Sequence, residues 1–364
     1  MNRIIFTVTN DLVYDQRMHR ICASLAQNGF VVTLTGRRLK NSLLPANLLF
    51  CQKRLYCFFS KGFMFYTEYN LRLFFYLLFQ PFDAVCAIDL DTILPCYFVS
   101  FFRGKKRIYD AHELFTEQKE IVTRPHIHKF WLAVEKFAVP RFQPGYTVNQ
   151  FIADELKRRY GVHYTVIRNL PELIIHPAVR VKNKDRFIIY QGAVNEGRSF
   201  ETLIPAMKFV DAKLKIYGNG NFFEQVKELI KKHNVEDKVE LKGAVVPDEL
   251  KSITPAAYIA VMLFEQTGLN QYYSLSNRFF DYIMAGVPQV CINYPEYKTI
   301  NDEFHIALMI EDTKIDSIAS ALNTLLHDDT LHKQLCADCV NAAKALNWQY
   351  EEGKLFKFYS ELFF

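Results

Sequence analysis

The fold of this chain is decided most clearly by the stretch Tyr273-Ser-Leu-Ser-Asn-Arg-Phe-Phe-Asp-Tyr-Ile-Met-Ala-Gly-Val-Pro-Gln-Val-Cys-Ile292. Its first residues are polar, its middle has apolar side chains at helical spacing, and Gly286 ends that pattern. The apolar run Gln289 to Ile292 that follows is typical of a buried strand. A helix followed directly by a buried strand indicates an α/β domain with a parallel sheet.

The polar start of this stretch suits a phosphorylated ligand. Ser274, Ser276 and Asn277 can each cap the helix, whose unpaired N–H groups and positive dipole end favour an anion. Asp281 lies about one turn further along, where a carboxylate can accept two hydrogen bonds from a ribose diol. The stretch therefore predicts a nucleotide site, and an ordinary capped core helix is the open alternative.

Length and composition predict a globular protein of two domains. The chain has 364 residues, of which 50% are hydrophobic, enough for two sizeable cores. Its apolar runs, such as Leu73 to Phe79, are far shorter than a membrane-spanning helix requires. Ile4 to Val8 is a short β-branched run and lacks the pattern of a signal peptide. We therefore expect a cytoplasmic protein.

The charge is distributed unevenly along the chain. Residues 1–170 hold 23 Lys and Arg against 13 Asp and Glu, a net charge of +10, and residues 171–364 have a net charge of −5. A basic N-terminal half suggests an anionic partner, either a membrane surface or a nucleic acid. No zinc-finger or RNA-recognition motif accompanies the basic residues, which argues against nucleic acid.

Strand and helix patterns alternate along the whole chain, which predicts parallel sheets covered on both faces. A charged, proline-containing stretch from Pro171 to Lys184 has the composition of a linker between two such series. The predicted strands of the first series are Arg3–Thr9, Phe30–Thr35, Asp83–Ile88, Arg107–Tyr109, Tyr146–Val148 and Tyr164–Ile167. Those of the second are Arg186–Gln191, Lys213–Tyr217, Lys238–Leu241, Tyr258–Leu263, Gln289–Ile292 and Ala307–Ile310. We expect two doubly wound domains whose ligands bind in a cleft between them.

One motif resembles the donor-site signature of GT-B glycosyltransferases of the family 4 type, the glycosyl transferases group 1. The segment Asp281-Tyr-Ile-Met-Ala-Gly-Val-Pro-Gln-Val290 matches the second half of that signature, and its first Glu falls on Tyr273. The resemblance covers nearly the whole chain. It implies an acceptor-side Rossmann-like domain at 1–172, a donor domain at 173–346, and a C-terminal helix at 347–364 that crosses back to the first domain.

The resemblance also implies donor-site residues. Family members hold the diphosphate with an Arg and a Lys after a glycine. Here Gly192 matches the glycine, Ala193 replaces the Arg, and Arg198 stands at the Lys position. Arg278 is a candidate substitute for the missing cation. The remaining residues expected to bind the nucleotide sugar are Gly218, Gly220, Val245, Ser274, Leu275, Ser276, Asn277 and Asp281.

The Gly218-x-Gly220 turn also allows another interpretation, a dinucleotide fingerprint. Phe223 stands where that fingerprint needs its third glycine, so NAD binding is the weaker hypothesis. Arg198 has an alternative as well, a solvated arginine at a helix start.

The first domain offers candidates for the reaction centre. His112 follows the predicted strand Arg107–Tyr109, at a strand end that faces the expected cleft, and histidine suits acid–base work. A hydrogen-bonded structural histidine is the alternative. The resembled family carries a His in this place, which favours a catalytic role with Arg198 and Asp281. The acceptor-side residues expected from the same resemblance are Asn10, Asp15, Arg17 and Glu113, and Asp15 can equally cap the following helix.

Asp89-Leu-Asp91 is similar to the metal-binding Asp-x-Asp of a different glycosyltransferase fold. Because it precedes the predicted helix Thr92 to Phe102, we interpret Asp91 as an N-cap and expect no catalytic metal and no cofactor.

The segment from Cys57 to Phe82 is dense in aromatic residues and contains Lys61 and Arg72. Aromatic and basic side chains together suit a surface that enters a bilayer interface. Core packing under the first sheet is the alternative. A peripheral position on the inner face of a membrane is therefore a second hypothesis for the localisation.

Together these features predict a glycosyltransferase that moves a sugar from a nucleotide diphosphate sugar to a glycan or lipid-linked glycan acceptor. The resemblance implies retention at the anomeric carbon. A sugar-nucleotide epimerase of the same architecture is an alternative. A catalytically degenerate nucleotide-sugar-binding protein is another, because Ala193 and Tyr273 replace charged residues of the family.

Overall fold

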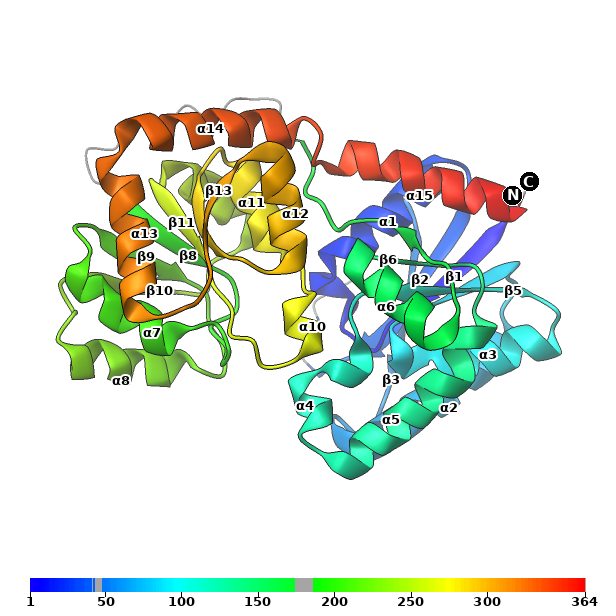
Figure 1. Ribbon diagram of the computed structural model, residues 1–364. Coiled ribbons are helices and arrows are strands. Elements are labelled where there is room, and N and C mark those ends of the chain that lie inside the picture. Colours follow the sequence, from blue (N-terminus) through cyan, green and yellow to red (C-terminus); the bar gives the residue numbers. More distant parts are fainter. Residues whose placement is uncertain (41, 43–47, 174–185, 364) are drawn as a thin grey trace. The chain divides into compact units, whose positions relative to one another are not determined.

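The computed structural model describes residues 1–40, 42, 48–173 and 186–363 (Figure 1). Most of the predicted linker at 171–184 therefore lies outside the described residues. The chain divides into two compact units. Unit 1 contains Met1–Asn169 together with Glu351–Phe364, and unit 2 contains Leu170–Tyr350.

Unit 1 is built on a parallel sheet. Within the described ranges this sheet has seven strands in the order β3-β2-β1-β4-β5-β6-β7. Every neighbouring pair is parallel, for example Ile4 opposite Val32 on one side and Ala84 on the other. The strands are β1 (Arg3–Thr7), β2 (Val31–Arg38), β3 (Cys51–Tyr56), β4 (Ala84–Ile88), β5 (Lys106–Ala111), β6 (Gly145–Thr147) and β7 (Thr165–Val166).

Strand β3 is absent from the sequence-based prediction. It lies at the edge of the sheet, where half-exposed Lys53 and Arg54 are tolerated and interrupt the apolar pattern. The helices of unit 1 are α1 (Gln16–Gln27), α2 (Gly62–Phe79), α3 (Ile93–Phe102), α4 (Lys119–Val122), α5 (Pro125–Ala138), α6 (Gln150–Tyr160) and α15 (Trp348–Phe363), whose first residues belong to unit 2.

Helix α15 contributes to the core of unit 1. The ring of Tyr359 lies 6.1 Å from Phe6 and 6.2 Å from Phe30 and Tyr146, centroid to centroid. Its hydroxyl is 3.3 Å from that of Tyr146. Trp348, Leu355, Phe358 and Tyr359 recur at helical spacing and are all buried, so this apolar stripe of α15 is packing.

Unit 2 is a second parallel sheet. Its strand order over the described residues is β10-β9-β8-β11-β12-β13. The strands are β8 (Phe187–Gln191), β9 (Lys213–Tyr217), β10 (Val239–Gly243), β11 (Ile259–Met262), β12 (Gln289–Ile292) and β13 (Ala307–Ile310). The helices are α7 (Phe200–Ala206), α8 (Phe223–His233), α9 (Pro247–Ile253), α10 (Leu269–Tyr272), α11 (Asn277–Met284), α12 (Pro295–Phe304), α13 (Ile315–His327) and α14 (Asp329–Ala343).

Strand order reverses direction once in each sheet, and this places the candidate sites. In unit 1 the first strand, β1, lies between β2 and β4, and in unit 2 the first strand, β8, lies between β9 and β11. Ligands of doubly wound sheets bind beyond the carboxyl ends of the strands at such a switch point. The predicted fold class, two doubly wound α/β sheets, is confirmed.

Candidate active site

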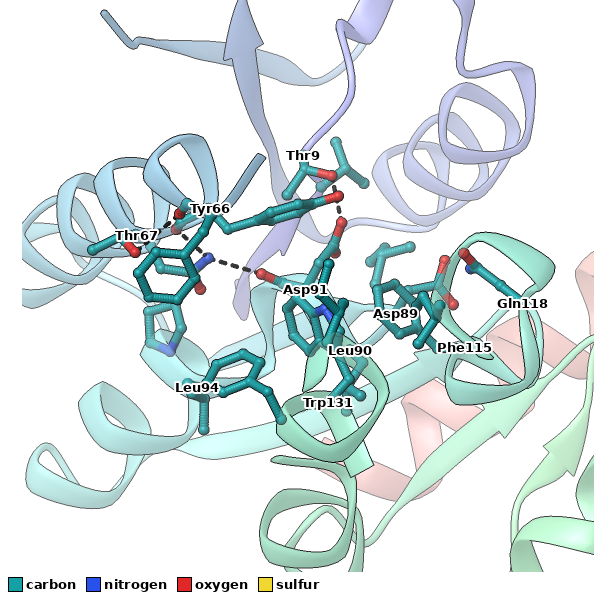
Figure 2. A pocket seen from close by; sticks show the side chains of 18 of the residues that line it. Thr9, Tyr66, Thr67, Asp89, Leu90, Asp91, Leu94, Phe115, Gln118 and Trp131 are labelled. Atoms are coloured by element: carbon teal, nitrogen blue, oxygen red, sulfur yellow. Dashed lines mark hydrogen bonds between the residues drawn. The ribbon is translucent and has the colours of Figure 1, made fainter. Parts of the chain in front are cut away.

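Unit 1 holds a cavity of about 1020 Å³ beyond the carboxyl ends of β1 and β4 (Figure 2). Its polar lining includes Asn10 from the loop after β1, Asp89 after β4 and His112 after β5. Side chains of α2, α3 and α5 form the remaining wall. The cavity therefore lies at the switch point, where the topology places a ligand.

His112 is fixed by carboxylates from two strand ends. Its backbone N–H donates to Oδ1 of Asp89 at 2.8 Å, and its ring Nδ1 lies 3.7 Å from Asp89 Oδ2. On the other side, ring Nε2 lies 3.1 Å from Oδ2 of buried Asp110. Both carboxylates favour a positively charged imidazole.

Arg17 completes this network from helix α1. Its Nη2 donates to Asp110 Oδ1 at 2.9 Å, and its Nε lies 2.9 Å from Nε2 of His112. Arg17 is 5% exposed and Asp110 is fully buried, so the ion pair lies in the interior. Arg17, expected on the acceptor side, thus supports His112 and does not line the cavity.

The electrostatic environment of this cluster favours the protonated forms of His112 and Asp89. Burial disfavours the charged form of His112, but Asp110 and Asp89 outweigh it and raise the pKa of the imidazole to about 9. Burial also raises the pKa of Asp89 to about 8, against the opposing effect of His112. Burial opposes ionisation of Asp110 too, yet Arg17 and His112 hold the pKa of that carboxyl below its usual value.

Nε2 of His112 has two neighbours with opposite requirements, since Arg17 N–H needs an acceptor and the Asp110 carboxylate needs a donor. Because the pKa of His112 is raised to about 9, both ring nitrogens carry protons at neutral pH, and Nε2 donates to the Asp110 carboxylate. The group that faces the cavity is therefore an Asp89–His112 pair with a proton available at neutral pH.

Asp89 also has a strained backbone. Its φ is 53°, a left-handed conformation that few residues other than glycine adopt. Such strain is concentrated at functional sites, where the surrounding structure maintains it. The Asp89 carboxylate, held in this way at the cavity wall, adds a residue to the site that the sequence-based prediction does not include.

Asp91 has a different role from the predicted one. Helix α3 begins at Ile93 with Thr92 as its N-cap, so the N-cap prediction for Asp91 is wrong. The Asp91 carboxylate instead accepts a hydrogen bond from Thr9 Oγ1 at 2.5 Å, which joins the loops after β1 and β4 (Figure 2). Burial raises its pKa to about 6.

The other predicted acceptor-side residues lie around the same cavity. Asn10, Asp15 and Glu113 line it. The Asp15 side chain accepts from the N–H of Met18 at 3.1 Å, so Asp15 does cap helix α1. A carboxylate can cap with one oxygen and still present the other to a ligand.

In unit 2 two glycines allow the loop after β9 to approach the loop after β8 closely. A Cβ on Gly218, whose φ is +149°, would lie 1.8 Å from the carbonyl oxygen of Gly192. A Cβ on Gly220 would lie 2.3 Å from the carbonyl oxygen of Val194. Gly218 and Gly220 therefore face the loop after β8, and their lack of side chains positions that loop.

Two arginines flank one aromatic ring beside this loop. The guanidinium carbon of Arg198 lies 4.2 Å from the Phe264 ring centroid, and that of Arg278 lies 5.0 Å from it. Nη1 of Arg278 is 3.6 Å from the position that a Cβ of Gly192 would take. The structure thus brings together the predicted residues Gly192, Arg198 and Arg278.

Arg278 is 7% exposed and rests on Tyr190, 4.5 Å from the ring centroid. Its Nη1 is 3.3 Å from the carbonyl oxygen of Gln191. Nη2 is buried and has no hydrogen-bond partner in the described part of the chain. A buried guanidinium with an unused donor is well suited to an oxyanion.

Helix α11 begins beside these cations. Its N-cap is Ser276, whose side chain makes no capping hydrogen bond, while Ser274 Oγ donates to Gln271 O at 2.8 Å. Asp281 accepts from Gln191 Nε2 at 3.2 Å, and Gln191 in turn accepts from Thr254. The Asp281 carboxylate is therefore oriented by the end of β8.

The remaining predicted donor residues are near the same elements. Asn277 is exposed at the first position of α11, and Leu275 is half-buried against the core. Val245 is half-buried in the loop between β10 and α9. Tyr273, at the position of the family's first Glu, ends α10.

Sequence analysis missed Asp89, Phe264 and Gln191 as members of these sites. Asp89 follows β4, which neighbours β1 at the switch point, and this placement becomes visible only once the strand order is known. Phe264 and Gln191 are uncharged residues at strand ends, and nothing in their local sequence distinguishes them.

Within the described ranges no cluster of three His, Cys, Asp or Glu could hold a metal ion. Among the helices of the same residues, none is long and apolar enough to span a membrane.

Comparison with known proteins identifies relatives of both sequence and fold. The model of the family described as Glycosyl transferases group 1 matches residues 173–346. The chain is 27% identical over 167 residues to the N-acetylgalactosamine-N,N'-diacetylbacillosaminyl-diphospho-undecaprenol 4-alpha-N-acetylgalactosaminyltransferase of Campylobacter jejuni. That match covers 45% of this chain and 44% of the enzyme, so it spans less than half of either.

Two solved structures share the architecture over nearly the whole chain. Sucrose-phosphate synthase from Thermosynechococcus elongatus has a TM-score of 0.80 at 15% identity, covering 100% of this chain and 99% of that one. HepE of Anabaena in complex with UDP has a TM-score of 0.74 at 11% identity, covering 99% and 100%.

Proposed function

We propose that the chain, whose residues 173–346 match the glycosyl transferases group 1 family and which has the GT-B fold, transfers a sugar from a nucleotide diphosphate sugar to an acceptor hydroxyl. The observation that carries the proposal is the pair Arg198 and Arg278 on Phe264, beside Gly192. Two guanidiniums beside a glycine turn match the charge of a diphosphate.

The donor half of the reaction follows from this arrangement. As the bond between the anomeric carbon and the diphosphate breaks, negative charge grows on the leaving oxygens. Arg198, Arg278 and the N–H groups at the start of α11 stabilise that charge, and they need no rearrangement because they are already in place. Asp281 accepts hydrogen bonds from the ribose, and transfer retains the anomeric configuration.

Unit 1 supplies the acceptor half in this proposal, as the predicted domain division 1–172 and 173–346 implies. The acceptor hydroxyl lies in the cavity near Asp89 and His112, where the Asp89 carboxyl group orients it through a hydrogen bond. The new bond forms between that hydroxyl oxygen and the anomeric carbon, and the hydroxyl proton passes to an oxygen of the leaving diphosphate.

We propose UDP as the donor nucleotide, supported by the bound UDP of the structurally similar HepE. The acceptor is proposed to be a glycan or a lipid-linked glycan, and the Campylobacter relative, which is named for a diphospho-undecaprenol acceptor, supports the second.

We also propose that unit 1 meets an anionic membrane surface. Phe101 and Phe102 of α3 are 60% and 66% exposed, and the cations Arg103, Arg107 and Arg141 lie on neighbouring aromatic rings. Aromatic side chains interleaved with cations suit the headgroup region. Co-sedimentation with anionic vesicles at low and high salt tests this. Salt-sensitive binding supports it, and its absence removes it.

The test of the main proposal uses labelled UDP- and GDP-sugars with the full chain. Slow water-dependent release of the nucleoside diphosphate, accelerated by cell-extract acceptors, supports transfer. Epimerised sugar formed without an acceptor would favour an epimerase instead. Binding without turnover, even with acceptors present, would favour a nucleotide-sugar-binding protein.

A further inference from the structure

Helix α2 is apolar on more than the face it buries. Its buried residues Phe65, Tyr69, Leu73 and Leu77 form one stripe at four-residue spacing. Other large apolar side chains of α2 remain outside that stripe, and Phe63, Leu71 and Phe75 are more than half exposed. A surface helix normally carries polar residues on its outer face, so this apolar surface indicates a binding site for another molecule.

Part of that surface is a wall of the unit 1 cavity. The lining includes Tyr66 and Phe74 of α2, Leu94 and Phe98 of α3, and Phe130 of α5. Tyr66 and Leu94 are labelled in Figure 2. Phe98 and Phe130 remain 39% and 46% exposed although both line the cavity. The wall is therefore open to solvent, and core packing does not account for it.

The opposite end of the same cavity is acidic. Asp15, Asp89, Asp91 and Glu113 all line it, beside His112. Carboxyl groups accept hydrogen bonds from hydroxyl groups whether or not they are ionised, whereas a phosphate would add negative charge to this acidic end. This end therefore suits the hydroxyls of a sugar.

A single cavity with a carboxylate end and an apolar end fits an amphipathic ligand. We propose that it binds an acceptor made of a sugar joined to an apolar chain, with the sugar at Asp89 and His112 and the chain between α2, α3 and α5. This inference rests on the proposed function, because it names the acceptor class of that reaction.

The apolar wall continues to the protein surface, which gives a longer chain a path out. The Phe98 ring, part of the cavity lining, stacks on Phe102 at 6.5 Å and on Phe137 at 6.3 Å. Phe102 is 66% exposed and Phe137 is 37% exposed. In this proposal, the apolar chain of the ligand passes from the cavity onto the exposed aromatic surface.

The binding test uses alkyl glucosides with methyl, hexyl and octyl chains, below their micelle concentrations. The chain has two tryptophans, and Trp131 lines the cavity, so its fluorescence reports occupancy. We expect the affinity to rise about fourfold for each methylene that leaves water. Octanol, which lacks the sugar, should bind at least tenfold more weakly than octyl glucoside.

Variants of cavity residues test whether the dependence of affinity on alkyl chain length arises in this cavity. Phe130→Glu places a carboxylate in the apolar end and should lower octyl glucoside affinity at least tenfold, while methyl glucoside affinity is unchanged. Leu94→Trp fills the same end without a charge and should act alike. Phe79→Glu is the control, because Phe79 is 76% exposed on α2 and does not line the cavity. It should bind like the unmodified protein.

Equal affinity for methyl and octyl glucosides would overturn the inference, as would a chain-length effect that both cavity variants preserve. Octanol binding as tightly as octyl glucoside would overturn the assignment of the sugar end. UDP binding is measured on the same samples. Normal UDP binding without chain-length dependence refutes this inference alone, whereas chain-dependent binding without any UDP binding refutes the proposed glycosyl transfer.

Discussion

The most discriminating variant of the donor site is Arg278→Met. Arg278 is buried, rests on Tyr190 and Phe264, and keeps Nη2 without a partner among the described residues. Methionine has a similar length and no charge. The substitution therefore removes the cation while leaving most of the space filled.

The expected changes in binding and in stability differ in size. A charge-assisted hydrogen bond to phosphate contributes about 1.5–3 kcal/mol, so the variant should bind UDP roughly 10- to 150-fold more weakly. Folding loses about 0.5–2 kcal/mol of cation–π attraction, but it no longer requires a buried charge to be desolvated. The free energy of unfolding should therefore change by no more than about 1 kcal/mol.

Isothermal titration calorimetry with UDP and thermal unfolding measure the two quantities on one preparation. Arg186→Met is the matched control, because Arg186 also belongs to unit 2 and stacks on a tyrosine, Tyr258, at 4.6 Å. It should leave UDP affinity unchanged. If Arg278→Met binds UDP as tightly as the unmodified protein, the buried cation does not serve the diphosphate and the reasoning fails.

Two further predictions concern the interior of each unit. The pKa of His112 is raised to about 9 in the folded protein. The contribution of protonated His112 to the free energy of unfolding is therefore complete below about pH 6.5 and is lost as the pH rises through 9. An NMR titration should show this pKa. The variant Asp89→Asn should have a lower His112 pKa, because a neighbouring negative charge is removed. A titration midpoint near pH 6.5 in the unmodified protein would contradict the prediction. Gly218→Ala should destabilise unit 2 by roughly 2–4 kcal/mol in urea unfolding, since its Cβ would meet Gly192, whereas Gly243→Ala, with φ +73° and open space around it, should cost about 1 kcal/mol. Equal losses in the two variants would show that the contact between the loops is unimportant.

Much of the fold was predictable because most of the central parallel strands are largely apolar, and β9 alternates Lys213 and Lys215 with buried apolar residues. Strands β9, β12 and β13 begin and end where the sequence pattern places them. Strand β3 was missed because an edge strand can carry Lys53 and Arg54, which read as a basic surface patch. Local pattern identifies strands by burial, and an edge strand is only half-buried.

The candidate sites were predictable where a motif carries them, and less so where distant contacts do. Gly192, Arg198 and Arg278 come together as the sequence suggests. The partner of Asp91, Thr9, is 82 positions away, so its hydrogen bond could not be inferred from neighbouring residues. Asp89 likewise depends on the order of strands in the sheet, which its own sequence does not encode.

The return of the chain to unit 1 at Glu351 bears on how the protein folds during synthesis. Phe6 and Phe30 emerge from the ribosome before unit 2, but Tyr359, which packs on both, emerges only after it. Until then an aromatic part of the unit 1 interior is uncovered, while every residue of unit 2 has already been made. A nascent chain stalled before Tyr359 should therefore protect unit 2 from proteases well before unit 1 becomes resistant.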